Sequence, residues 1–251
     1  MKKPFLSVVI PCYNEEKNLK RGVLDEVKNY LKKQKYDWEV IISDDGSTDG
    51  SLNFLEKYCQ KNPSFLLLKN PHGGKPFAVK AGIQKAKGKI VLFTDMDQST
   101  PLKEIEKFFP FFEKNYDVVI GSRGLERKGF SILRKVASIV FRSFRQILLL
   151  REIKDTQCGF KAFKNKVAKD LFSQLLIFKN PTQVKGWRVG AFDVELLFIA
   201  QKRGYKIAEV PVEWIDKDIA VGKKRNFFKE SKEMFKEILR VKFNDWRGFY
   251  D

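Results

Sequence analysis

Three short apolar runs in the N-terminal half of the chain each end in polar or acidic side chains. The runs cover residues 5–11, 38–43 and 89–94, and acidic side chains stand just beyond each of them. Near-continuous apolar runs of this length are typical of strands buried in a parallel sheet. With helical stretches between them, they predict an α/β fold with one doubly wound, mostly parallel sheet and flanking helices. Its strand tips should face one crevice.

Asp95 and Asp97 form the most informative acidic group, because they directly follow the third run. Ligands of open α/β sheets bind outside the carboxyl ends of the strands. Carboxylate oxygens there are suited to a hard divalent cation and to the phosphates that it holds. In the alternative reading the two aspartates only end the strand, with Thr100 as a helix N-cap and Pro101 at the first helical position.

Composition narrows the classes of partner. The 49 Lys and Arg exceed the 31 Asp and Glu, so the formal net charge is 49 − 31 = +18, and 251 residues suit one large domain. An anionic partner is expected: nucleic acid, an anionic membrane surface or a phosphorylated substrate. No Gly-x-Gly occurs, and Gly74-Lys75 precedes Pro76, so the dinucleotide fingerprint and the NTPase phosphate loop are both excluded.

Cysteines and hydropathy indicate the compartment. Cys12, Cys59 and Cys158 match no zinc or redox spacing and favour a reducing environment, and the single His72 cannot build a histidine metal site. The start of the chain is unlike a signal peptide, and no apolar run is long enough to span a membrane. We therefore expect a cytoplasmic protein, peripheral on the inner face of a membrane. Because the chain stops at Asp251, any membrane span would come from a separate subunit.

Five motifs occur in the order found in family 2 glycosyltransferases, which this chain resembles. They are residues 9–15 (VIPCYNE), 44–50 (DDGSTDG), 95–97 (DMD), 121–123 (GSR) and 155–160 (DTQCGF). Within that family the chain looks like dolichyl-phosphate glucosyltransferases and polyprenyl-phosphate mannose synthases, over about residues 7–214. The resemblance implies a GT-A-like fold and one active site.

The resemblance also implies roles in binding a nucleotide diphosphate-sugar. Pro11, Tyr13, Glu15 and Asp45 match residues around the base and ribose, and Lys75 and Asp95 match the diphosphate site. Asp95, Asp97 and Gln98 are the expected ligands of Mg²⁺ or Mn²⁺, although mannose synthases carry the corresponding amide one position later, where this chain has Ser99. The motif at residues 44–50 has an alternative reading as a turn followed by an N-cap.

The second half of the chain is expected to bind the acceptor. Arg123, Arg134 and Ser138 match the positions that hold a polyprenyl phosphate, and an arginine fork suits phosphate. Residues 130–150 predict a basic amphipathic helix, either interfacial on an anionic membrane or packed on the core with a solvated basic face. Asp193, counted among the catalytic candidates with Asp95, Asp97 and Arg123, opens a helix with Glu195; both acids are expected to orient the sugar or the acceptor pocket.

The C-terminal region is expected to form a part separate from the catalytic domain. Residues 1–215 are expected to be catalytic, with a nucleotide-sugar half (1–100) and an acceptor half (101–215). Residues 216–251 should hold a basic loop and an amphipathic helix at 227–243, with Phe228, Phe235, Ile238 and Leu239 on one side. The basic residues 223–225 of the loop either close on the diphosphate or form a solvated charge run.

The function that follows is inverting transfer of a hexose from a UDP- or GDP-sugar to a polyprenyl or dolichyl phosphate, with glucose favoured. Three alternatives stay open. One is a GDP-mannose-dependent mannosyltransferase, and another uses a hydroxyl acceptor in surface polysaccharide synthesis. The third belongs to a different class, a non-catalytic basic module on membrane or nucleic acid. The leading reading has no nucleic-acid partner.

Overall fold

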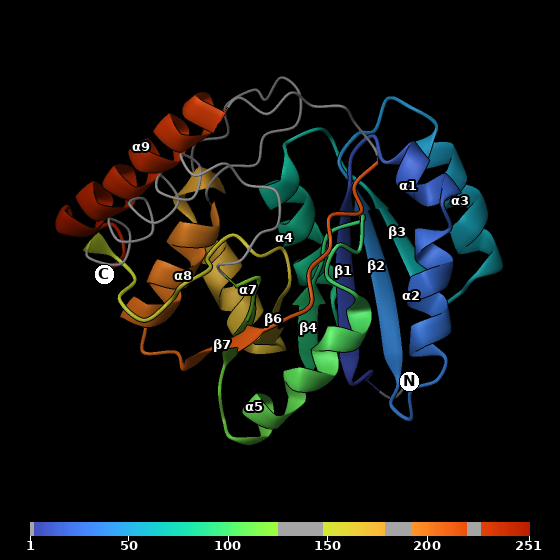
Figure 1. Cartoon of the computed structure of the whole chain (residues 1–251), viewed down its shortest axis with the longest axis horizontal. Helices are drawn as coiled ribbons and strands as arrows, with labels where there is room; N and C mark the ends of the chain where they lie inside the picture. Colours follow the sequence, from blue (N-terminus) through green and yellow to red (C-terminus); the bar gives the residue numbers. More distant parts are fainter. Residues whose placement is uncertain (1–2, 125–147, 179–191, 220–226) are drawn as a thin grey trace.

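One mixed sheet runs through the part of the chain that this computed structural model describes, residues 3–124, 148–178, 192–219 and 227–251 (Figure 1). The seven strands lie in the order β3 (Phe65–Lys69), β2 (Trp38–Asp44), β1 (Leu6–Cys12), β4 (Ile90–Phe93), β6 (Lys161–Lys164), β5 (Val118–Ser122) and β7 (Ile207–Pro211). All pairs are parallel except those of β6, which is antiparallel to both β4 and β5. The expected mostly parallel α/β sheet is confirmed.

Helices cover both faces of this sheet (Figure 1). They are α1 (Glu16–Lys20), α2 (Val23–Leu31), α3 (Ser51–Lys61), α4 (Lys75–Lys85), α5 (Phe109–Glu113), α7 (Asn165–Gln174), α8 (Phe192–Lys202) and α9 (Phe227–Trp246), with 3₁₀ turns η1 (Leu102–Lys107) and η2 (Leu176–Phe178). Side chains alternate between the faces of a strand, so Val8 and Ile10 pack against α1 and α2 while Val9 packs against α4. The core therefore has two apolar layers with the sheet between them.

Several local expectations need correction. The helix after β1 is broken at Gly22, which has φ of 89° and stands before a second helix. Pro101, with extended backbone, precedes a 3₁₀ turn rather than opening an α-helix, and Thr100 is not its N-cap. The sequence also predicts a last strand over residues 207–214, but this strand, β7, ends at Pro211.

The face of α9 was also assigned incorrectly. The helix extends to Trp246, and Ile238 is buried with Val241 while Phe235 and Leu239 are exposed. Neighbouring residues on a helix are about 100° apart, so Ile238 and Leu239 cannot share the centre of one face. A sequence with apolar residues on two sides of a helix does not show which side meets the body of the protein.

Among the described residues, no helix is both long and apolar enough to cross a membrane. The predicted basic helix at 130–150 lies outside the described residues apart from its last three positions, and so do Arg134, Ser138 and the basic residues 223–225.

Candidate active site

The register of the central strands brings the sequence motifs to one edge of the sheet. Cys12 at the end of β1 lies level with Asp44 at the end of β2, and Val9 lies level with Phe93 at the end of β4. Backbone hydrogen bonds continue beyond the strands, from Asp45 N to Cys12 O (2.8 Å) and from Thr94 N to Val9 O (3.0 Å). The segments that carry Tyr13, Asp45 and Asp95 therefore emerge side by side.

Asp45 is fully buried and receives hydrogen bonds from the turn before α4. The backbone N–H groups of Gly73 and Gly74 donate to its two carboxylate oxygens at 2.9 and 2.8 Å, and Nδ1 of His72 lies 2.9 Å from Oδ2. Burial raises the pKa of Asp45, and these hydrogen bonds oppose that rise. The contacts fix the glycine turn against the tip of β2.

An aromatic pair lies beside this carboxylate. The rings of Tyr13 and His72 stack with centroids 4.4 Å apart and an angle of 19° between their planes. Tyr13 was expected at the nucleotide site, and Pro11 lies just before it in β1, fully buried. The sequence did not predict a role for His72 beside Tyr13. A single histidine followed by two glycines carries no signal for contact with a residue so far away along the chain.

The loops after β1 and β2 are locked together by Asn14. This residue has φ of 55°, and its side-chain Oδ1 accepts hydrogen bonds from the backbone N–H groups of Thr48 (2.8 Å) and Asp49 (3.3 Å). Next to it, Glu15 accepts a hydrogen bond from Asn18 at 2.7 Å. Burial, with the charges of Asp218, Asp97 and Asp95, raises the pKa of Glu15 to about 7. Glu15 is therefore near enough to the acidic pair to be affected by its charge.

Asp95 and Asp97 lie where the third motif predicts, beyond the end of β4. Lys75 at the start of α4 forms an ion pair with Oδ1 of Asp95, and Ser99 N donates to Oδ1 of Asp97 at 2.7 Å. Burial and the neighbouring Asp95 charge raise the pKa of Asp97 to about 6. Burial alone would lower the pKa of Lys75, but the charges of Asp95 and Asp193 raise it, so Lys75 stays protonated.

Gly159 brings a second segment against Asp95. A Cβ at this position would lie 1.9 Å from Oδ2 of Asp95, so a larger residue would displace the carboxylate or the loop. The close approach carries the loop before β6, residues 155–160, up to the acidic pair. This is the physical reason for a glycine in the DTQCGF motif.

Arg123 at the end of β5 is held by that same loop. Its Nε and one terminal nitrogen donate to the two oxygens of Asp155 at 2.8 and 2.9 Å, and its backbone N–H donates to Oδ2 at 3.1 Å. Although burial would raise it, the pKa of Asp155 lies well below its usual range because of the Arg123 hydrogen bonds and charge. This paired contact orients the guanidinium at the end of β5.

Asp193, in the first turn of α8, pairs with Lys161, which none of the five sequence motifs contains. Nζ of Lys161 lies 2.6 Å from Oδ1 of Asp193, donates to the carbonyl of Cys158 at 2.5 Å, and is fully buried. Glu195, by contrast, points away from this pair: it accepts from Arg240 (3.2 Å) and Tyr250 (3.1 Å) near α9. These contacts give no support to a role of Glu195 in orienting the substrate pocket, and that role stays a prediction.

The donor set around β4 fits a divalent cation that arrives with phosphate ligands. Asp95 and Asp97 are close enough for one charge to raise the pKa of the other, and Oε1 of buried Gln98 has no hydrogen-bond partner among the described residues. Gln98 has φ of 49°, and its Nε2 donates to the carbonyl of Asp95 at 2.8 Å. The described residues contain no group of three or more acidic, His or Cys side chains placed to hold a metal ion.

Comparison with known proteins decides the family. The model of Glycosyl transferase family 2 matches residues 7–172. The chain belongs to glycosyltransferase family 2. This family 2 enzyme is 36% identical over 264 residues to the dolichyl-phosphate beta-glucosyltransferase of Dictyostelium discoideum, covering 98% of the chain and 76% of the relative. It is 36% identical over 263 residues to the Homo sapiens protein of the same name, covering 97% and 76%.

A solved structure supports the fold of this glycosyltransferase. The chain matches Mycobacterium tuberculosis glucosyl-3-phosphoglycerate synthase, solved with Mn²⁺, UDP and its product, with a TM-score of 0.63 and 18% identity. The match covers 95% of this chain and 78% of that one. The predicted GT-A-like fold, the resemblance to family 2 and the assignment as an enzyme are all confirmed. The non-catalytic alternative is wrong.

Proposed function

We propose that this glycosyltransferase moves glucose from UDP-glucose to the phosphate of a dolichyl or other polyprenyl lipid, with inversion at the anomeric carbon. The observation that carries the proposal is the likeness to dolichyl-phosphate beta-glucosyltransferases across nearly the whole chain. The geometry agrees, because a charged group for each phosphate lies at one edge of the sheet: Lys75 and the acidic pair for the donor, and Arg123 for the acceptor.

In the donor site, Tyr13 and Asp45 would contact the base and ribose, with Pro11 and Glu15 beside them. The stacked ring of His72 extends the flat wall that a base requires. Lys75 would neutralise part of the diphosphate. Asp95, Asp97 and Gln98 would hold Mg²⁺ or Mn²⁺, which when bound supplies positive charge against the departing diphosphate.

In the acceptor site, Arg123 would bind the lipid phosphate, together with Arg134 and Ser138 from the segment outside the described residues. The phosphate oxygen attacks the anomeric carbon in line with the departing UDP, which inverts that centre. A phosphate monoester has a second pKa of about 6, so the attacking oxygen carries its charge at neutral pH and needs no general base. Asp193, bound to Lys161, would hold the loop 158–161 in place rather than remove a proton.

The proposal places the enzyme on the cytoplasmic face of a membrane, where nucleotide-sugars and the lipid phosphate meet. Cys12, Cys59 and Cys158 are free thiols, which suits a reducing compartment. The division into a donor half (1–100), an acceptor half (101–215) and a C-terminal part (216–251) stays a prediction, and so does a separate membrane-spanning subunit.

A transfer assay tests this function. UDP-glucose and GDP-mannose are each offered with and without polyprenyl phosphate, and glycolipid and free nucleotide are measured. We expect glucolipid from UDP-glucose. Asp97→Asn or chelation of divalent metal should lower the rate at least about a hundredfold, because losing metal stabilisation costs several kcal/mol. Asp37→Asn, an exposed aspartate at the opposite end of β2, is the matched control.

Three outcomes would contradict parts of this proposal. Formation of mannolipid from GDP-mannose would show that the proposed donor is wrong. Release of UDP only with a hydroxyl acceptor would show that the proposed acceptor is wrong. Full turnover in EDTA would falsify the metal role while leaving the transfer itself in place.

A further inference from the structure

The outer face of α9 exposes large apolar side chains. Leu239, Phe243 and Trp246 are 44%, 52% and 81% exposed, and at about 100° per residue they fall within roughly 60° of arc. Phe249, just beyond the helix, is 48% exposed, and the rings of Phe243 and Trp246 lie 6.1 Å apart. These four residues are named here the α9 apolar stripe.

The opposite side of the helix is already used for folding. Ile238 and Val241 are fully buried in the core layer of α7 and α8. Arg240 and Tyr250 attach the C-terminal region to buried Glu195. The contacts that hold α9 against the rest of the protein therefore do not involve the α9 apolar stripe.

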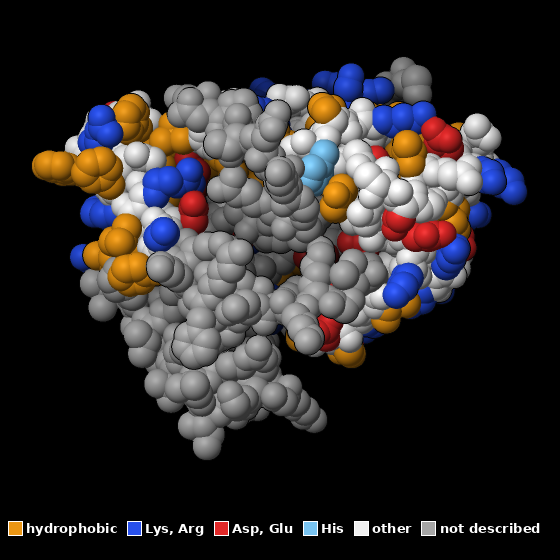
Figure 2. All heavy atoms as spheres, turned by 90° about the horizontal axis from the view of Figure 1, so that it is seen from above, with side chains coloured by type: hydrophobic (Ala, Val, Ile, Leu, Met, Phe, Trp, Pro, Cys, Tyr) orange, Lys and Arg blue, Asp and Glu red, His pale blue; other side chains and the backbone are white. Residues whose placement is uncertain are grey.

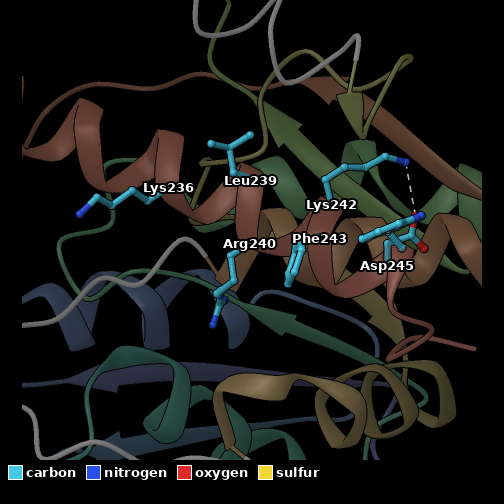
Figure 3. Close-up of a pocket in the computed structure, with 7 residues that line it drawn as sticks. Lys236, Leu239, Arg240, Lys242, Phe243 and Asp245 are labelled. Atoms are coloured by element: carbon cyan, nitrogen blue, oxygen red, sulfur yellow. Dashed lines mark hydrogen bonds and ion pairs between the residues drawn. The ribbon is translucent and has the colours of Figure 1, made fainter.

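Cations border the stripe on both sides. Lys242 lies on one side and Lys236 and Arg247 on the other, with Arg247 stacked 5.4 Å from the ring of Phe243. An open hollow of about 680 Å³ lies on this surface, lined by Lys236, Leu239, Arg240, Lys242, Phe243 and Trp246. Figure 3 shows how the labelled side chains project from α9. Asp245, the acid that also lines it, is paired with Lys202 at 2.7 Å and with Lys242 at 3.4 Å.

Helix α9 lies at the upper left of Figure 1, toward the end of the molecule to which the carboxyl ends of the parallel strands point. Figure 2 looks from above Figure 1, toward the carboxyl ends of the strands, and orange and blue side chains gather at its left edge, where α9 lies in Figure 1.

We propose that the α9 apolar stripe binds the surface of an anionic lipid bilayer, with its bordering lysines and arginine at the level of the head groups. Exposed Trp and Phe flanked by Lys and Arg are typical of helices that lie in a membrane interface. A second copy of this chain fits poorly, because a symmetric contact would bring the same cations together in a protein of net charge +18. The proposal deepens the proposed function, since a polyprenyl phosphate presents its phosphate at a bilayer surface.

The apolar part is tested with vesicles of equimolar phosphatidylserine and phosphatidylcholine. Phe243→Ser and Trp246→Ser should each lower the partition coefficient about tenfold, because each removes a large side chain from the interface. Leu66→Ser is the matched control. Leu66 is 45% exposed on β3, the edge strand at the opposite end of the sheet from β7, and its loss should leave the partition coefficient unchanged.

The charged part has its own matched pair. Lys236→Glu/Lys242→Glu should weaken binding to anionic vesicles much more than Lys33→Glu/Lys57→Glu. Both double variants change the formal charge equally, and all four lysines are exposed. Pure phosphatidylcholine vesicles should bind weakly, and rising salt should release the protein in part, since salt screens only the charged contribution.

Results that overturn the proposal are distinct from failure of the proposed function. Absence of vesicle binding by the parent protein, or equal binding by the α9 and control variants, would overturn it. So would a dimer seen by sedimentation that Trp246→Ser abolishes while vesicle binding stays intact. Glucose transfer to a detergent-solubilised polyprenyl phosphate should be the same for Trp246→Ser and the parent. If the parent lacks transfer there but binds vesicles, only the function fails.

Discussion

The pairing of Lys161 with Asp193 bears on the chemical role that Asp193 can have in the site. Lys161 is fully buried, and its partners in the described part of the chain are the Asp193 carboxylate and the Cys158 carbonyl, with the Phe93 ring 5.2 Å away. A buried charge is tolerated only when it is paired. Asp193 is therefore required to neutralise Lys161, which leaves it poorly suited to act as a proton acceptor.

Replacing Asp193 with Asn tests this reading. We expect kcat for transfer to a lipid phosphate to fall by no more than about tenfold and the shape of its pH profile to stay unchanged. Loss of a general base typically costs about a hundredfold or more and removes a limb of that profile. Lys161→Met/Asp193→Asn, which removes both charges, should recover stability lost in Asp193→Asn. Activity abolished in a folded, substrate-binding Asp193→Asn protein would instead favour a hydroxyl acceptor.

At the scale of single elements, α9 is held by a polar attachment as well as by packing. Glu195 in α8 is fully buried and accepts hydrogen bonds from Leu176 N (2.8 Å), Arg240 and Tyr250. Burial raises the pKa of Glu195, and these partners oppose the rise. The attachment fixes the rotation of α9, and with it the side of the helix that faces outward.

Arg240→Ala should therefore loosen α9. We expect the free energy of unfolding to fall by about 1–2 kcal/mol, a modest value because the Arg240 side chain is 36% exposed. Backbone amides of residues 235–251 should exchange hydrogen faster than in the parent. Lys236→Ala, one turn away and exposed, should change stability by less than about 0.5 kcal/mol. Equal effects of the two substitutions would show that the ion pair does not hold the helix.

At the scale of the whole molecule, Arg123 and Asp155 join the end of β5 to the loop that precedes β6. The same loop is tied to β7, because Glu209 accepts hydrogen bonds from the N–H groups of Lys154 (2.7 Å) and Asp155 (2.8 Å). The buried Arg123–Asp155 ion pair thus helps to join β5 and β7 to the loop that reaches the acidic pair. Its loss should be felt in global stability.

The pH dependence of unfolding tests that coupling. The pKa of Asp155 is lowered in the folded protein, so its stabilising contribution is fully present above the unfolded pKa of about 3.9 and is lost as the pH falls below it. In urea titrations Asp155→Asn should be about 3 kcal/mol less stable than the parent between pH 5 and 7, and the gap should narrow below about pH 4. A gap that widens with acid would contradict the assignment.

The amino-acid sequence determined the features that depend on neighbours along the chain. Apolar runs gave β1, β2 and β4, and the acidic residues that follow them had to emerge at one edge because parallel strands share a direction. The ordered motifs were enough to indicate family 2. These inferences succeed because strand burial and helix period are local properties.

Only the tertiary structure decided which distant residues meet. Lys161 and Asp193, Tyr13 and His72, and Arg123 and Asp155 are pairs whose contact depends on how the connections return to the sheet, and the antiparallel insertion of β6 places two of them. The same holds for α9, where apolar residues occupy two sides and the fit to α7 and α8 selects Ile238 over Leu239. The choice depends on the shape of the opposing surface, and no pattern within the helix contains that shape.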